Sequence, residues 1–236
     1  MTLLLPSPSI AMHISEGILP LSWALIWFAA SLPFLAIGLR TLAKRSSEDL
    51  SSKPLVGMVS ALVFVISCMP VPVPTAGTCA HPCGVGLAAV LLGPALGVLV
   101  AAVALMIQAL FLSHGGLSTW GANLFAMGVV GSFTGYLAFR LFRLCGAGPV
   151  ASAFAAGLLS DWGTYAATSM ILAAGIKGSS SFWPLTGNIA MAFVPTQLPL
   201  GIIEGAITAG MVSLLRKKRP DLLARTALTA IKGDGQ

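Results

Sequence analysis

Long apolar runs dominate this sequence and restrict the chain to one broad class of protein. Five of them lie at 19–39, 55–71, 124–144, 150–176 and 189–215, and a longer sixth lies at 84–112. A helix that crosses a bilayer needs about 20 apolar residues. Only 8% of the residues are charged, whereas soluble domains carry roughly 25%. We therefore expect an all-α integral membrane protein, and we exclude a soluble globular domain and a disordered chain.

The run at 84–112 is too long for one ordinary span, and Gly93-Pro94 interrupts it. The residue before a proline is pushed out of the helical conformation. Twelve of the 13 Lys and Arg residues lie in three clusters, at 40–53, at 140–147 and from 216 onward. Positive charge collects in cytoplasmic loops, and the three clusters share one side only if 84–112 forms two short segments. We therefore predict about seven transmembrane helices, with the N-terminus outside and the C-terminus cytoplasmic.

This topology places the protein in the inner or plasma membrane as a multi-pass protein in contact with lipid. The net charge of +6 then belongs to the loops, so no nucleic-acid partner is expected. We divide the chain into a membrane domain at 12–215, a cytoplasmic tail at 216–236 and an N-terminal segment at 1–11. Ser9-Ile10-Ala11 has the small-x-small pattern of a cleavage site, although a basic region is missing. Removal of 1–11, translation from Met12 and retention of an external extension stay open, and we favour a mature terminus at Met12.

The residues just before the first apolar run contain a potential metal chelator. If Met12 is the mature terminus, its α-amine, the backbone amide nitrogen of His13 and the His13 imidazole supply three coplanar nitrogens. Planar nitrogen donors suit Ni(II) or Cu(II), and they also accept Co(II). A fourth nitrogen would complete the square. A histidine at a membrane boundary is otherwise an ordinary interfacial residue, and this alternative stays open.

His81 is the candidate for the fourth nitrogen. It lies at 77–84, between the second and third predicted segments, and the topology puts it on the same external side as His13. Cys79 and Cys83 flank it. Their spacing also fits a thiolate site for zinc or copper, a disulfide on an oxidising side, or buried thiols. The sequence does not choose among these uses of the cysteines.

Polar residues also lie within or beside the apolar runs, namely Gln108, His114, Asn123, Asp161, Gln197 and Glu204. Ionisable groups inside a membrane are costly and are usually functional or paired. His114 and Asn123 are the candidates for hydrogen-bonding a metal-bound imidazole, because both are expected on the external side. We interpret Asp161 and Glu204 first as structural residues that hydrogen-bond across the bundle.

The two histidine motifs resemble CbiM, the substrate-specific membrane component of cobalt energy-coupling-factor (ECF) transporters. They read Met-His-Ile-Ser-Glu-Gly-Ile-Leu-Pro at 12–20 and Gly-Thr-Cys-Ala-His-Pro-Cys-Gly at 77–84. Further matches at 108–110, 114–117, 121–123, 161, 164–165 and 204–205 extend the resemblance from 12 to 215. The nickel component NikM has the same fold. The sequence departs from the cobalt pattern at Ser15, where Met is common, and at Cys83, where Thr is usual.

The resemblance implies an ECF S-component-like bundle of seven segments, with the N-terminal dipeptide inserted from outside. It implies Co(II) as transported substrate, with Ni(II) as second candidate and no organic cofactor. The implied ligands are the Met12 amine, the amide nitrogen and imidazole of His13, and the His81 imidazole. The implied partners are a CbiQ-like coupling subunit, CbiO-like ATPase subunits and a small CbiN-like membrane subunit, which together supply cobalt for cobalamin synthesis.

The source of energy separates the functional hypotheses. The sequence contains no G-x-x-x-x-G-K-[ST] phosphate loop, so the chain cannot hydrolyse ATP by itself. A membrane hydrolase is disfavoured, because H-E-x-x-H is missing and no nucleophile lies beside an evident base. We therefore predict no catalytic residues and no enzyme. The alternatives are a nickel-specific subunit and a stand-alone, gradient-driven carrier, which would need a titrating carboxylate such as Asp161 or Glu204.

Overall fold

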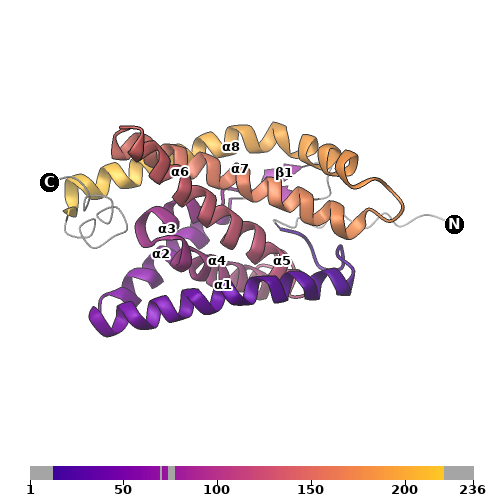
Figure 1. Cartoon of the computed structure of the whole chain (residues 1–236), viewed down its shortest axis with the longest axis horizontal. Helices are drawn as coiled ribbons and strands as arrows, with labels where there is room; N and C mark the ends of the chain where they lie inside the picture. Colours follow the sequence, from indigo (N-terminus) through magenta and orange to yellow (C-terminus); the bar gives the residue numbers. More distant parts are fainter. Residues whose placement is uncertain (1–12, 70, 74–77, 221–236) are drawn as a thin grey trace.

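A computed structural model describes residues 13–69, 71–73 and 78–220. Most of the long helices run along the long axis of the molecule (Figure 1). In chain order the elements are α1 (Leu21–Glu48), α2 (Ser52–Ser67), β1 (Val71–Val73), β2 (Thr78–Ala80), α3 (Val85–Leu92), α4 (Pro94–Phe111), α5 (Trp120–Asn123), η1 (Leu124–Gly131), α6 (Ser132–Leu144), α7 (Pro149–Ile176) and α8 (Phe182–Lys218). α5, the π-helix η1 and α6 join into one continuous helix.

Helices occupy the apolar runs, as the sequence predicted. Among the described residues, four helical segments are long and apolar enough to cross a membrane: Leu21–Glu48, Pro94–Phe111, Trp120–Leu144 and Phe182–Lys218. The helical membrane fold is therefore confirmed, while complete crossing by α2, α3 and α7 stays a prediction. The exception to an all-α fold is the short antiparallel hairpin of β1 and β2, in a segment that was expected to be a loop.

The long apolar run breaks where Gly93-Pro94 predicted. Gly93 has φ 89° and ψ 162°, outside the helical region, and Pro94 begins α4 at a position where a missing N–H costs nothing. α3 has 8 residues and is about 12 Å long, well short of the roughly 30 Å hydrocarbon layer. Its last carbonyl, that of Leu92, accepts a hydrogen bond from Arg45 at 2.9 Å. A short, capped helix therefore ends inside the bundle.

Two helices begin four or more residues earlier than the hydropathy pattern predicted. α8 starts at Phe182 rather than 189. Pro184 does not prevent this earlier start, because it falls in the first turn, where backbone N–H groups have no helical partner. The helix predicted at 124 starts at Trp120. Both extensions lie at the ends of apolar runs, where tertiary contacts decide the boundary.

The basic clusters gather at one end of the molecule. The C-terminal ends of α1, α6 and α8 all lie at the left of Figure 1. Each of these helices carries basic residues in its last turn: Arg45, Arg143 and residues 216–218. Residues 216–218, the start of the predicted tail, belong to α8. The part of the predicted tail beyond 220 lies outside the described residues.

Small residues bring α3, α7 and α8 into close contact. A Cβ built on Gly86 of α3 would lie 2.9 Å from the Ala156 carbonyl of α7. A Cβ on Gly157 of α7 would lie 2.7 Å from the Glu204 carbonyl of α8. Figure 1 shows α7 and α8 side by side over much of their length. This packing places side chains of α7 and α8 next to the residues that lead into α3.

Candidate metal centre

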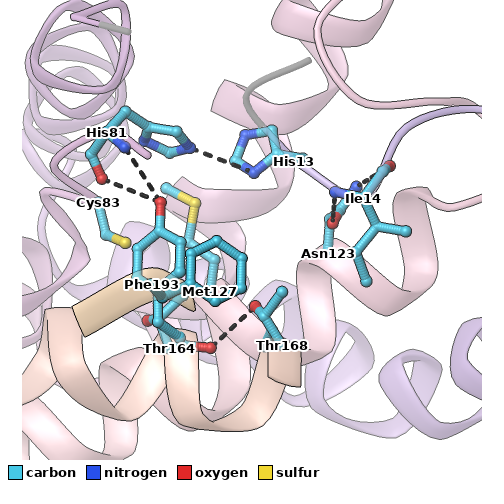
Figure 2. Close-up of a pocket in the computed structure, with 11 residues that line it drawn as sticks. His13, Ile14, His81, Cys83, Asn123, Met127, Thr164, Thr168 and Phe193 are labelled. Carbon is cyan, nitrogen blue, oxygen red and sulfur yellow. Dashed lines mark hydrogen bonds between the residues drawn. The ribbon is translucent and has the colours of Figure 1, made fainter. Parts of the chain in front are cut away.

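Two imidazoles from distant parts of the sequence meet inside the bundle. His13 precedes α1, and His81 follows β2. The Nδ1 atom of His13 lies 3.3 Å from the Nε2 atom of His81, and the two rings are nearly perpendicular, at 84°. Figure 2 shows both rings pointing toward one another. The expectation that these histidines share one side of the protein is thus met by direct contact between them.

Hydrogen bonds on the far side of each ring fix which nitrogen carries the proton. Gln108 donates from its amide nitrogen to the Ser67 hydroxyl at 2.8 Å, so its oxygen faces His13. That oxygen accepts from His13 Nε2 at 2.8 Å. His81 Nδ1 donates to the carbonyl of Pro82 at 2.9 Å. With these protons placed, His13 Nδ1 and His81 Nε2 both present lone pairs to the space between the rings.

The charge state of His13 suits a metal ligand. Burial of the ring lowers the pKa of His13 well below its usual value, and the neighbouring His81 lowers it further. Gln108 opposes this shift only in part. Because metal ions bind the neutral imidazole, the ring is held in the form that a cation requires.

The segment after His13 is tied to the bundle through Ile14. Asn123 accepts a hydrogen bond from the Ile14 N–H at 3.0 Å and donates to its carbonyl at 3.2 Å. Thr119 donates to the same carbonyl at 2.6 Å. Figure 2 shows Asn123 beside this backbone. Asn123 therefore positions the chain next to His13, whereas the sequence had suggested that it would support an imidazole ring.

His81 is positioned from α7. The hydroxyl of Tyr165 accepts a hydrogen bond from the His81 N–H at 3.1 Å and donates to the His81 carbonyl at 3.3 Å. Both His81 and Tyr165 are almost completely buried. Because Tyr165 projects from a long packed helix, the backbone at His81 has little freedom to move away from His13.

A small cavity lies beside the two rings (Figure 2). Its volume is about 20 Å³, enough for roughly one water-sized species. Its lining residues are His13, Ile14, His81, Cys83, Asn123, Ala126, Met127, Thr164, Tyr165, Thr168 and Phe193. The volume of the space thus matches one small species such as a water molecule or an ion.

Glu204 holds the start of α3 against α8. Its carboxylate accepts hydrogen bonds from the Cys83 N–H at 2.6 Å and the Gly84 N–H at 2.9 Å. Gly84 has φ 70°, so the chain turns sharply just after His81. This contact fulfils the structural role expected of Glu204 and anchors the loop that carries His81.

Removing this carboxylate should destabilise the protein. In Glu204→Ala two buried N–H groups lose their acceptor, at about 1–3 kcal/mol each, so we expect a loss of about 2–6 kcal/mol in unfolding free energy. Chemical denaturation in mixed micelles measures it. Thr208→Ala is the matched control one turn further along α8, because its buried hydroxyl has no hydrogen-bond partner among the described residues. Equal stability of the two variants would contradict this role.

The structure describes some of the other candidate residues and not others. Met12 lies outside the described residues, and the side chain of Cys79 is not described either. His114 lies in the loop before α5, and its buried Nδ1 atom has no hydrogen-bond partner within the described part of the chain. Cys83 is buried and carries a free thiol. Gln108, which the sequence placed among the polar residues and the family matches, accepts a hydrogen bond from the His13 ring.

Gln108 can be tested as the positioning residue for His13. Gln108→Leu removes the acceptor for the His13 ring proton while keeping a similar volume. Loss of such an outer hydrogen bond typically weakens metal binding by 10–100-fold, so we expect the Kd for Co(II) to rise by about that factor. Equilibrium dialysis of the purified protein measures it. Gln197→Leu is the control, since the buried Gln197 amide makes no hydrogen bond among the described residues. An unchanged Kd in Gln108→Leu would exclude this role.

Together, the fold and the site define a polytopic helical membrane protein with a pair of facing imidazoles beside a small cavity. The chain belongs to the CbiM family, since residues 13–222 match the family's model, described as the cobalt uptake substrate-specific transmembrane region. It is therefore a membrane component of cobalt uptake, with a transport role rather than an enzymatic one.

Curated relatives agree over nearly the whole chain. A cobalt transport protein CbiM of Geobacter sulfurreducens is 60% identical over 233 residues, which cover 99% of this chain and 67% of the relative. The cobalt transport protein CbiM of Sorangium cellulosum is 57% identical over 214 residues, or 91% of this chain and 95% of the relative.

Solved structures share the fold. A crystal structure of a transition metal transporter has a TM-score of 0.77 at 30% identity, covering 87% of this chain and 93% of the other. A truncated transition metal transporter has a TM-score of 0.76 at 29% identity, covering 87% of this chain and 99% of the other. The bundle described above is thus the fold of known metal transporters.

Proposed function

We propose that this chain is the metal-capturing subunit of an ATP-driven ECF importer for Co(II). The observation that carries the proposal is the pair of lone pairs, on His13 Nδ1 and His81 Nε2, that face each other across 3.3 Å. Two acceptor nitrogens so close repel unless a positive species lies between them. An imidazole ligand usually lies about 2.0–2.1 Å from its metal. At that distance from both nitrogens, the N–cation–N angle would be about 105°.

The N-terminal dipeptide supplies the remaining ligands in this proposal. The Met12 amine and the His13 amide nitrogen join the two imidazoles in a four-nitrogen set, and the His13 ring closes a six-membered chelate through Nδ1. The hydrogen bond from His13 Nε2 to Gln108 supports this, because it leaves Nδ1 for the metal. Nitrogen sets of this kind also accept Ni(II), so a nickel-specific subunit is the alternative within the same class.

The energy for transport comes from partners. The chain lacks a phosphate-binding loop, and we infer CbiO-like ATPases acting through a CbiQ-like coupling subunit, with a CbiN-like small subunit. The helix ends that carry the basic clusters face the cytoplasm, and the N-terminal segment and His81 face outside. Residues 1–11 are removed or never made, 12–215 form the membrane domain, and the cobalt serves cobalamin synthesis.

Uptake of radioactive Co(II) tests this function. Cells without their own cobalt importer should accumulate cobalt when they express this chain together with the three partner subunits, and not when the ATPase carries a substitution of its phosphate-binding lysine. Equal uptake by the chain alone, abolished by an uncoupler, would contradict the proposal and favour a gradient-driven carrier.

A further inference from the structure

A second polar cluster lies inside the bundle, beyond the imidazole pair. The Cys83 sulfur and carboxylate oxygens of Asp161 and Glu204 all lie within 4.8 Å of one another. The three side chains are exposed by only 1%, 0% and 1% respectively. They come from three separate elements: the turn before α3, the middle of α7 and the middle of α8. Two carboxyl groups so deeply buried require a compensating partner.

Contacts within the protein account for Glu204 but not for Asp161. Glu204 accepts two backbone hydrogen bonds at the start of α3. Asp161 receives only a weak contact from the Cys83 sulfur, at 3.7 Å to Oδ1. Its other oxygen, Oδ2, is buried and has no hydrogen-bond partner among the described residues. The Asp161 carboxyl group therefore faces the cluster with an acceptor that the described protein leaves unsatisfied.

The cluster adjoins the imidazole site. Cys83 lines the same cavity as His13 and His81, and Figure 2 shows it directly below the His81 ring. Asp161 lies four residues before Tyr165, the residue that holds His81, and therefore about 6 Å from it along α7. That step leads toward the start of α7, at the end of the bundle where the basic clusters gather.

We propose that Cys83, Asp161 and Glu204 form a second site for the transported divalent cation, one helical turn inward from the imidazole pair. This inference rests on the proposed function. A thiolate with two carboxylates suits borderline divalent ions such as Co(II) and Zn(II), which accept both sulfur and oxygen ligands. Binding of the cation releases the thiol proton. The positive charge of the cation then compensates the negative charges of the two buried carboxylates. The ion thereby exchanges a nitrogen set for a sulfur and oxygen set on its way inward.

Titration of the full chain in detergent with Co(II) alone tests the proposal. Dialysis counts bound ions, and the sulfur-to-cobalt charge-transfer absorption in the near ultraviolet reports thiolate ligation. At saturation we expect two cobalt ions per chain, with the sulfur absorption rising as the second binds. His81→Ala should keep one ion and the absorption. Cys83→Ser and Asp161→Asn should each lose the second ion, and Cys83→Ser should also lose the absorption.

Other cysteines serve as matched controls. Cys68→Ser, Cys79→Ser and Cys145→Ser should all retain the sulfur absorption, and its loss in one of them would overturn the assignment to Cys83. The first cobalt ion, still bound in Cys83→Ser, shows that this variant is folded. Absence of the absorption in the saturated wild-type protein would overturn the second site and leave the proposed function intact. Loss of the absorption in His81→Ala would also overturn it, because the thiolate would then belong to the imidazole site.

One outcome concerns both proposals. If the wild-type protein binds no cobalt at any concentration, the capture function itself is wrong, and the second site falls with it. The two failures are therefore distinguished by whether the first ion binds.

Discussion

Replacing His81 with alanine is expected to abolish high-affinity binding of Co(II). The substitution removes one of the two imidazole nitrogens that face each other at 3.3 Å. Even the loss of an outer hydrogen-bonding partner weakens metal binding by 10–100-fold, so the loss of a direct ligand should raise the Kd by more than about 100-fold. Equilibrium dialysis of wild-type and variant proteins measures the difference.

A folded variant is needed for this comparison to have meaning. Tyr165 accepts a hydrogen bond from the His81 backbone N–H, and His81→Ala retains that contact. The ring hydrogen bond that the substitution removes reaches only the adjacent Pro82 carbonyl, so the loop should stay in place. Its melting temperature should match that of Gln197→Leu, which retains the site. Wild-type affinity in His81→Ala would show that the imidazole pair does not hold the metal.

Blocking the amine of Met12 is expected to have an equally large effect. Acetylation of this amine in the mature protein converts it to an amide, which no longer supplies a basic nitrogen to the cation, and it introduces no new amine. The affinity for Co(II) should fall by more than about 100-fold, because the loss of an outer hydrogen bond alone weakens metal binding by 10–100-fold. Met12→Leu is the control, because it keeps the amine and changes only a side chain that the proposed chelate does not use.

The same prediction requires a particular N-terminus. Mass spectrometry of the N-terminal peptide from the native membrane should find a chain that begins at Met12 with a free amine. A peptide that begins at Met1 would exclude the amine ligand, and unchanged binding after acetylation of Met12 would exclude it independently. In either case the site would have to be rebuilt around His13, His81 and the cysteines.

The sequence predicted those features that depend on local patterns. Hydropathy located the helices, and Gly93-Pro94 located the break between α3 and α4, because a proline restricts the residue before it wherever it occurs. His13 and His81 were identified by chelate chemistry and by the positive-inside rule, which place residues on a side of the membrane without any knowledge of packing.

The sequence did not predict the contacts that hold the site together, because the two partners of each contact are distant along the chain. Gln108 lies 95 residues from His13, and Asn123 lies 109 residues from Ile14. Such pairs form only when the helices pack, and nothing in the local pattern distinguishes Gln108 from other polar residues in apolar runs. The match of residues 108–110 to the resembled family was an available signal.

Packing also holds the residues of the site in place. Hydrogen bonds fix the ring of His13, the backbone of Ile14 and the backbone of His81, each through a side chain on a helix. Ligands held in place from outside the site lose little freedom on binding, which favours affinity. The Glu204 contact with the start of α3 extends this support to the loop that carries His81.

X-ray absorption spectroscopy of the protein loaded with one Co(II) per chain tests the central claim most directly. We predict that nitrogen atoms alone bind the metal and that the outer scattering shows two imidazole rings. A sulfur atom bound to this first cobalt, or oxygen ligands without imidazole scattering, would contradict metal capture by His13 and His81.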